Sequence, residues 1–117
     1  MSVEVRQGQI WLADLGQPVG SIAGYRRPVV ILQGDRVNAS LLETYLATPL
    51  TSNLRLSRFP TNLALAASAT GLPKDSIAQL PLTLAVDHSQ LIERVGQVSE
   101  SQLAQLFLRL DIVLGRT

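Results

Sequence analysis

The amino-acid sequence predicts a mainly β fold with α structure: a small, strongly bent sheet or barrel of short strands with one C-terminal amphipathic helix packed on it. Most of the chain consists of short aliphatic and β-branched runs separated by turns rich in Gly and Pro. The last segment instead repeats its apolar residues at helical spacing. A chain of 117 residues has the usual size of one domain, so we expect a single domain over residues 1–117.

The N-terminal third predicts two strands joined by a flexible loop. Residues 8–14 alternate loosely between apolar and polar, which suits a first strand. Residues 15–27 contain three glycines, which are free to adopt positive φ, so we expect a loop there. The run Pro-Val-Val-Ile-Leu at residues 28–32 indicates a central strand that is buried on both faces.

The middle of the chain predicts further short strands. Residues 37–42 are ambiguous and permit one helical turn, capped by Asp35 or Asn38. Polar residues 51–59 indicate a loop, residues 71–75 a turn and residues 87–89 a turn or a short helical turn. The remaining strands are expected at residues 43–50, 62–67, 76–80, 82–86 and 94–98.

The C-terminal helix is the most strongly indicated element. Ser99 and Gln102 match a capping box, and Gly115 suits the residue after the helix end. The residues at helical spacing are Leu103, Leu106, Phe107, Leu110, Val113 and Leu114. Leu108 and Ile112 widen the apolar face, which predicts either a helix sunk deep in the fold or a face that meets a second subunit.

Composition excludes several classes of chemistry. The chain has no cysteine and one histidine, so disulfides, thiolate zinc sites and multi-histidine metal sites are excluded, and we expect no metal or cofactor. His88 lies between Asp87 and Ser89 in an apparent turn, which favours a capping role over catalysis. Since neither a signal peptide nor a long apolar run is present, we expect a cytoplasmic protein with no membrane contact.

Two arginine-bearing loops are the candidate functional segments. Arg26 and Arg27 stand where the first loop meets the strand at residues 28–32, and Pro28 restricts the backbone of Arg27. A second loop at residues 51–58 adds hydroxyl groups and two more arginines. The pattern permits a positive groove of the kind expected for RNA, but composition alone favours the alternative that these arginines are ordinary solvated residues. The candidate RNA-binding residues are Ser21, Tyr25, Arg26, Ser52, Arg55 and Arg58.

Read in order, the motifs of residues 6–115 resemble those of the MazF/PemK family of toxin ribonucleases. Residues 20–28, Gly-Ser-Ile-Ala-Gly-Tyr-Arg-Arg-Pro, are similar to the family's Gly-Ser-Glu-x-x-Gly-x-Arg-Pro loop. Residues 49–52, Pro-Leu-Thr-Ser, match its Pro-x-Thr-Ser element, and Asp-Ser-Ile at residues 75–77 also fits. The sequence departs from the pattern at Ile22, where the family has Glu.

The resemblance implies an SH3-like barrel that works as a homodimer and is neutralised by a small acidic, MazE-like antitoxin. It also implies metal-independent cleavage of single-stranded RNA, with Arg27 and Thr51 as the catalytic residues. Attack by the substrate's own 2′-OH would leave a 2′,3′-cyclic phosphate and a 5′-OH end. Two alternatives on the same fold remain. A gyrase-directed module of the CcdB type is disfavoured because Leu-Gly-Arg-Thr at residues 114–117 is not the aromatic tail that such proteins use. An inactive binding module stays open because Ile22 replaces the family's acidic residue.

Overall fold

The computed structural model describes residues 4–117 as an antiparallel sheet with short helices on its edges. The seven strands are β1 (Gln9–Asp14), β2 (Arg26–Ile31), β3 (Thr44–Thr51), β4 (Asn62–Leu65), β5 (Ser76–Gln79), β6 (Leu84–Asp87) and β7 (Leu91–Gln97). The α-helices are α1 (Asp35–Asn38), α2 (Ala67–Thr70) and α3 (Glu100–Val113). Three 3₁₀ turns are η1 (Leu54–Arg58), η2 (Leu80–Leu82) and η3 (His88–Gln90).

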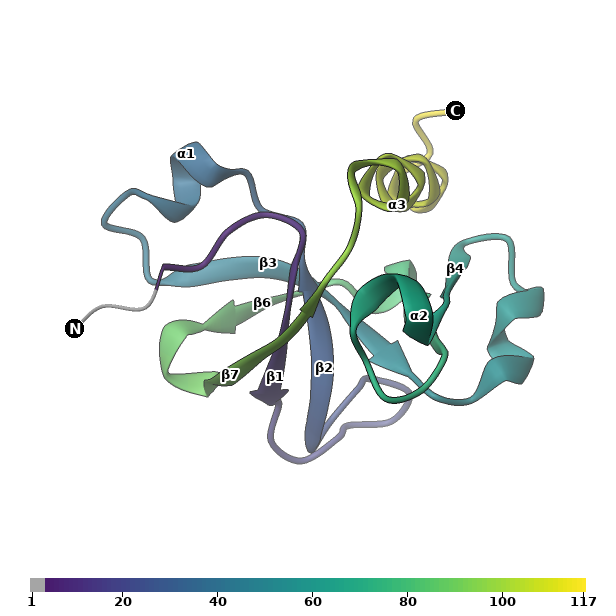
Figure 1. Cartoon of the computed structure of the whole chain (residues 1–117), viewed down its shortest axis with the longest axis horizontal. Helices are drawn as coiled ribbons and strands as arrows, with labels where there is room; N and C mark the ends of the chain where they lie inside the picture. Colours follow the sequence, from purple (N-terminus) through teal and green to yellow (C-terminus); the bar gives the residue numbers. More distant parts are fainter. Residues whose placement is uncertain (1–3) are drawn as a thin grey trace.

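Strand β3 is the centre of the sheet because it pairs with three neighbours. The main path runs β4-β5-β3-β2-β1-β7, and β6 pairs with the first half of β3. The second half of β3 pairs with β2 on one side and, at its end, with β5 on the other. This branching bends the sheet and confirms the mainly β fold that the sequence predicts (Figure 1).

Strand β2 is buried on both faces, as its apolar run predicts. Val29, Val30 and Ile31 are all fully buried. Because successive side chains of a strand point to opposite faces, Val30 joins one hydrophobic cluster with Ile10, while Val29 and Ile31 join a second with Trp11. Because β2 packs into both hydrophobic clusters, the backbone of Arg26 and Arg27 at its start is held in a fixed position.

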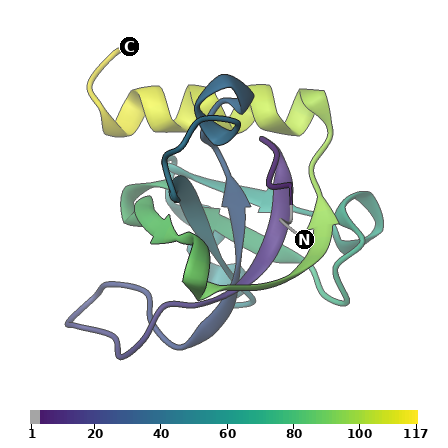
Figure 2. The same ribbon diagram turned by 90° about the vertical axis from the view of Figure 1, so that its left-hand side faces the viewer.

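Helix α3 lies across one end of the sheet, and the loop between β1 and β2 projects from the opposite end (Figures 1 and 2). The capping box is confirmed: Ser99 Oγ accepts from the Gln102 amide at 3.1 Å, and Gln102 Oε1 accepts from the Ser99 amide at 2.8 Å. Leu106 is fully buried in the core. The partly buried residues beside it are Leu103, Phe107 and Leu110.

The prediction of a helix sunk deep in the fold is wrong. Leu108 is 60% exposed and Ile112 is 43% exposed, so only one face of α3 contacts the core. Val113 and Leu114, which we assigned to the apolar stripe, are also exposed at 37% and 61%. The last turn of the helix is therefore more exposed than its apolar spacing predicts.

Several short elements differ from the sequence prediction. Helix α1 begins at Asp35 and has no side-chain cap, because Gly34 occupies the cap position. Helix α2 and turn η1 fall where we expected strand end and loop, and η2 replaces a strand around Pro81. Strand β7 begins three residues earlier than its predicted start at Arg94. Within residues 4–117, no helix is both long enough and apolar enough to cross a membrane.

Candidate nucleic-acid interface

The sheet topology brings three strand ends together at one point. Strand β3 is antiparallel to both β2 and β5, so the end of β3 lies beside the starts of the other two. Val29 pairs with Pro49, and continuing this register by two residues places Arg27 opposite Thr51. The two residues singled out by the family resemblance are therefore brought to the same end of the sheet by pairing that the sequence does not reveal.

A cavity of about 310 Å³ opens at these strand ends. Arg27 and Thr51 both line it. The remaining lining residues are Arg26, Pro28, Leu50, Ser52, Leu72, Pro73, Lys74 and Ser76. Three of the lining side chains are cationic, three carry a hydroxyl and none is a carboxylate, which is a lining suited to a phosphate group.

The Arg27 side chain is held in place while its charge stays available. Its Nε donates to the carbonyl oxygen of Gly24 at 3.2 Å, and the residue is half-buried. Within residues 4–117 the ion pairs join Arg6 to Glu4 and Arg116 to Asp111, so no described carboxylate neutralises Arg27. The terminal nitrogens of the guanidinium are thus free to donate to an anion in the cavity.

Thr51 presents a hydroxyl at the end of β3. Its Oγ1 accepts a hydrogen bond from the Asn53 amide at 3.2 Å. The Asn53 side chain in turn accepts from the Arg55 amide at 3.3 Å and caps η1. Because the Thr51 oxygen is an acceptor in the turn, its own proton remains available for donation to a ligand.

Gly24 fixes the shape of the loop that leads into Arg27. A Cβ atom at this position would lie 2.4 Å from the backbone nitrogen of Pro18 and 2.6 Å from its Cδ. Only glycine permits this close approach of the two loop segments. The carbonyl that holds Arg27 is therefore positioned by a packing contact within the loop.

The other predicted RNA-binding residues divide into two groups. Arg26 and Ser52 line the cavity with Arg27 and Thr51. The residues that do not line it are Ser21, Tyr25, Arg55 and Arg58. The last two lie on η1, where the Arg58 guanidinium stacks 5.1 Å from the ring centroid of Phe59. Lys74 and Ser76, which no sequence motif indicated as site residues, reach the cavity through the pairing of β5 with β3.

His88 lies in a different part of the molecule, beside a cavity of about 710 Å³. Its Nδ1 is 3.3 Å from the hydroxyl of Tyr45, and burial, together with the charges of Glu43 and Asp87, raises the pKa of this phenol. Asp87 caps η3, and hydrogen bonds from Ser89 lower the pKa of its carboxyl group. This is the capping arrangement that the turn composition predicts.

Taken together, these features define a small barrel-like protein: a bent antiparallel sheet, a crossing helix, and a cavity at the strand ends whose lining has three cationic side chains and no carboxylate. The family model described as "PemK-like, MazF-like toxin of type II toxin-antitoxin system" matches residues 6–114. The chain belongs to this family.

Individual relatives agree with the family assignment. "Endoribonuclease MazF6" of Mycobacterium tuberculosis is 38% identical over 102 residues, covering 87% of this chain and 90% of the relative. The crystal structure of MazF (Form-I) from Deinococcus radiodurans superposes with a TM-score of 0.83 at 21% identity, covering 97% of this chain and 99% of that one. A mycobacterial endoribonuclease in complex with its cognate antitoxin superposes with a TM-score of 0.78 at 20% identity, covering 97% of both chains. These structures share the fold of this chain.

Proposed function

We propose that this protein is the toxin of a type II toxin–antitoxin pair and acts as an endoribonuclease on single-stranded RNA. The observation that carries the proposal is the shared cavity of Arg27 and Thr51, which has three cationic side chains and no carboxylate in its lining. A relative named as an endoribonuclease is 38% identical over 87% of the chain, which supports the same activity here.

The proposed reaction uses the substrate's own nucleophile. The 2′-oxygen forms a bond to the adjacent phosphorus while the bond between phosphorus and the 5′-oxygen breaks, leaving a 2′,3′-cyclic phosphate and a 5′-OH end. The proton of the 2′-OH passes to a base, and the departing 5′-oxygen gains a proton. Because the nucleophile is already tethered beside the phosphorus, the protein has only to orient the RNA and stabilise charge.

Arg27 and Thr51 have separate roles in this proposal. The Arg27 guanidinium donates hydrogen bonds to the non-bridging phosphate oxygens, where negative charge grows in the transition state. The Thr51 hydroxyl donates one further hydrogen bond to the same group. Arginine keeps its proton at neutral pH, so we assign Arg27 to electrostatic stabilisation and leave the general base open.

The test is cleavage of a defined single-stranded RNA in the presence of EDTA, with mapping of the product ends. We expect wild-type protein to give cyclic-phosphate products, and Arg27→Ala or Thr51→Ala to lower kcat by about 10²- to 10³-fold, the usual effect of removing a transition-state donor. Arg27→Lys keeps the charge but loses the planar pair of donors, so we expect it to stay impaired. Arg36→Gln, an exposed cation on α1 outside the cavity, is the control and keeps wild-type activity.

Cleavage at the wild-type rate by the Arg27→Ala variant would contradict the site assignment. RNA that stays intact with wild-type protein would contradict the activity itself. The inactive binding module predicts a gel shift with intact RNA, and the CcdB-type module predicts inhibition of DNA gyrase.

The proposal extends to partners and setting. The complex of a structural relative with its cognate antitoxin supports an antitoxin as the partner of this chain, and the family resemblance implies that it is small and acidic. We further propose that the protein works in the cytoplasm as a homodimer of one domain spanning residues 1–117, with the exposed Leu108 and Ile112 of α3 available for the contact between subunits.

A further inference from the structure

Lys74 lies on the opposite side of the cavity from Arg27. Strand β3 runs between β2 and β5, so Thr51 at its end stands between the arginine pair on one side and the residues leading into β5 on the other. Neighbouring strands are about 4.8 Å apart, so the two outer strand ends are separated by about 10 Å. The strand order therefore places Arg27 and the turn of Lys74 on either side of Thr51, and the hydroxyl groups of Thr51, Ser52 and Ser76 also line the cavity.

The turn at residues 71–75, which carries Lys74, is held by hydrogen bonds on both sides of this residue. Before it, Leu72 is buried in the core and its amide donates to Thr70 Oγ1 at 3.3 Å. After it, Asp75 Oδ1 accepts from the Ala67 amide at 2.8 Å. Gly96 of β7 packs so closely on the turn that a Cβ there would lie 2.4 Å from the carbonyl oxygen of Thr70. The backbone of Lys74 is therefore held in position by contacts unrelated to its charge.

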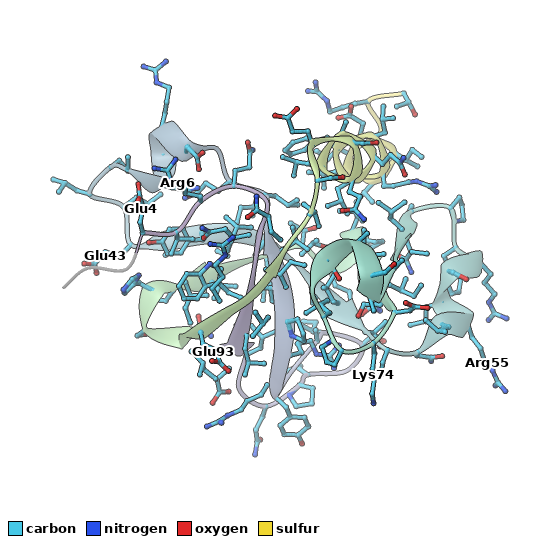
Figure 3. The ribbon with its side chains drawn as sticks, viewed as in Figure 1. Glu4, Arg6, Glu43, Arg55, Lys74 and Glu93 are labelled. Carbon is cyan, nitrogen blue, oxygen red and sulfur yellow. The ribbon has the colours of Figure 1, made fainter. Side chains whose placement is uncertain are left out.

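The charge of Lys74 is available to a ligand. Among residues 4–117 no carboxylate forms an ion pair with it, and the neighbouring Asp75 carboxylate is engaged at the start of α2. Figure 3 shows Lys74 extending from the turn toward the side of the molecule from which the β1–β2 loop projects, whereas Arg55 lies on the outer edge of η1. Lys74 is exposed and lines the cavity, whereas Arg55 does not.

We propose that Lys74 is a positioning residue that binds a phosphate of the RNA next to the one being cleaved. The inference rests on the proposed function, since it assumes that the scissile phosphate lies at Arg27 and Thr51. An exposed ammonium on a flexible stem acts as a point charge, which binds ground state and transition state alike. Its loss therefore weakens binding of the RNA backbone and leaves the chemical step nearly unchanged.

The experiment measures binding and cleavage separately for Lys74→Gln, Lys74→Arg and wild type. The binding probe is a fluorescent single-stranded oligonucleotide with 2′-O-methyl groups throughout, which blocks the nucleophile, and anisotropy is recorded over a series of NaCl concentrations. For Lys74→Gln we expect Kd to rise about 3- to 10-fold, as for loss of one partly screened charge-assisted contact. The slope of log K against log salt should fall by about 0.7, the value for one phosphate contact with a single strand.

In the cleavage assay, Lys74→Gln should raise KM by a similar factor while kcat stays within about twofold, because uniform binding affects KM alone. Lys74→Arg should retain both affinity and salt slope. Arg36→Gln removes the same charge outside the cavity and is expected to match wild type in every measurement.

Three outcomes would overturn the inference. An unchanged salt slope in Lys74→Gln would show that the ammonium makes no phosphate contact. A large fall in kcat at unchanged KM would place Lys74 on the reacting phosphate. An equal effect of Arg36→Gln would show that Lys74→Gln acts only by lowering the net charge of the protein. Failure of the proposed function appears differently, as absence of cleavage by wild type, while the binding measurements still report on Lys74.

Discussion

Replacing Gly24 by alanine should separate catalysis from stability. The new Cβ would lie 2.4 Å from the Pro18 nitrogen, and ordinary contact begins at 3.4 Å, so the two loop segments must part by about 1 Å. That movement carries the Gly24 carbonyl away from the Arg27 Nε that it holds at 3.2 Å. A displacement of about 1 Å at a reacting centre lowers the rate by up to about 10²-fold.

The stability effect of Gly24→Ala should be moderate, because the loop lies at the edge of the sheet. Overpacking of this kind typically lowers the free energy of unfolding by about 1–3 kcal/mol. The assay is single-turnover cleavage of RNA at saturating protein, with thermal unfolding recorded on the same samples. Gly34→Ala is the matched control, because its φ is −65° and a Cβ there meets no atom within 4 Å. A folded Gly24→Ala variant with a wild-type rate would refute the idea that loop packing positions Arg27.

Three further predictions concern the stability of the fold. Leu106→Ala should lower the free energy of unfolding by about 2–5 kcal/mol, since the side chain is fully buried. Leu41→Ala, at a side chain that is 100% exposed, should change it by less than about 0.5 kcal/mol, and urea unfolding distinguishes the two. Ser99→Ala removes the helix cap and should lower the free energy of unfolding by about 1 kcal/mol in the same measurement. The pKa of Tyr45 is raised in the folded state, which therefore favours the neutral phenol. This contribution to the free energy of unfolding is complete below pH 10.0 and is lost as the pH rises through the pKa of the folded state. Thermal melts should show that stability falls with rising pH and that Tyr45→Phe lessens the fall; an equal fall in both proteins would contradict the prediction.

The elements that the sequence predicts well are those with a local cause. The buried strand β2 follows from an uninterrupted β-branched run, and the start of α3 follows from Ser99 and Gln102, which bond to each other's backbone within one turn. Helices α1 and α2 have four residues each, too few to show a helical period. The exposure of Val113 depends on tertiary structure, because the apolar spacing of a helix does not show which of its turns contact the core.

The candidate site divides in the same way. Pro28 identifies Arg27 as a fixed cation from the sequence alone, and the family resemblance adds Thr51. Lys74 stands far along the chain in an ordinary turn, and only the pairing of β5 with β3 brings it to the cavity. Register between distant strands is set by the whole core, so a single sequence gives no local signal for this residue.

The backbone of Tyr25 adopts a rarely populated conformation in the loop between β1 and β2. Its φ of 58° makes it the one non-glycine residue within residues 4–117 with a positive φ. Such a conformation costs about 1–3 kcal/mol and persists only where the surroundings over-determine it. Here the Tyr25 amide donates to Gly16 and its carbonyl accepts from Leu15, while Gly24 is wedged against Pro18. The Tyr25 ring is 64% exposed and adjoins the arginine pair in the chain, and we propose that it offers a flat surface on which an unpaired base stacks.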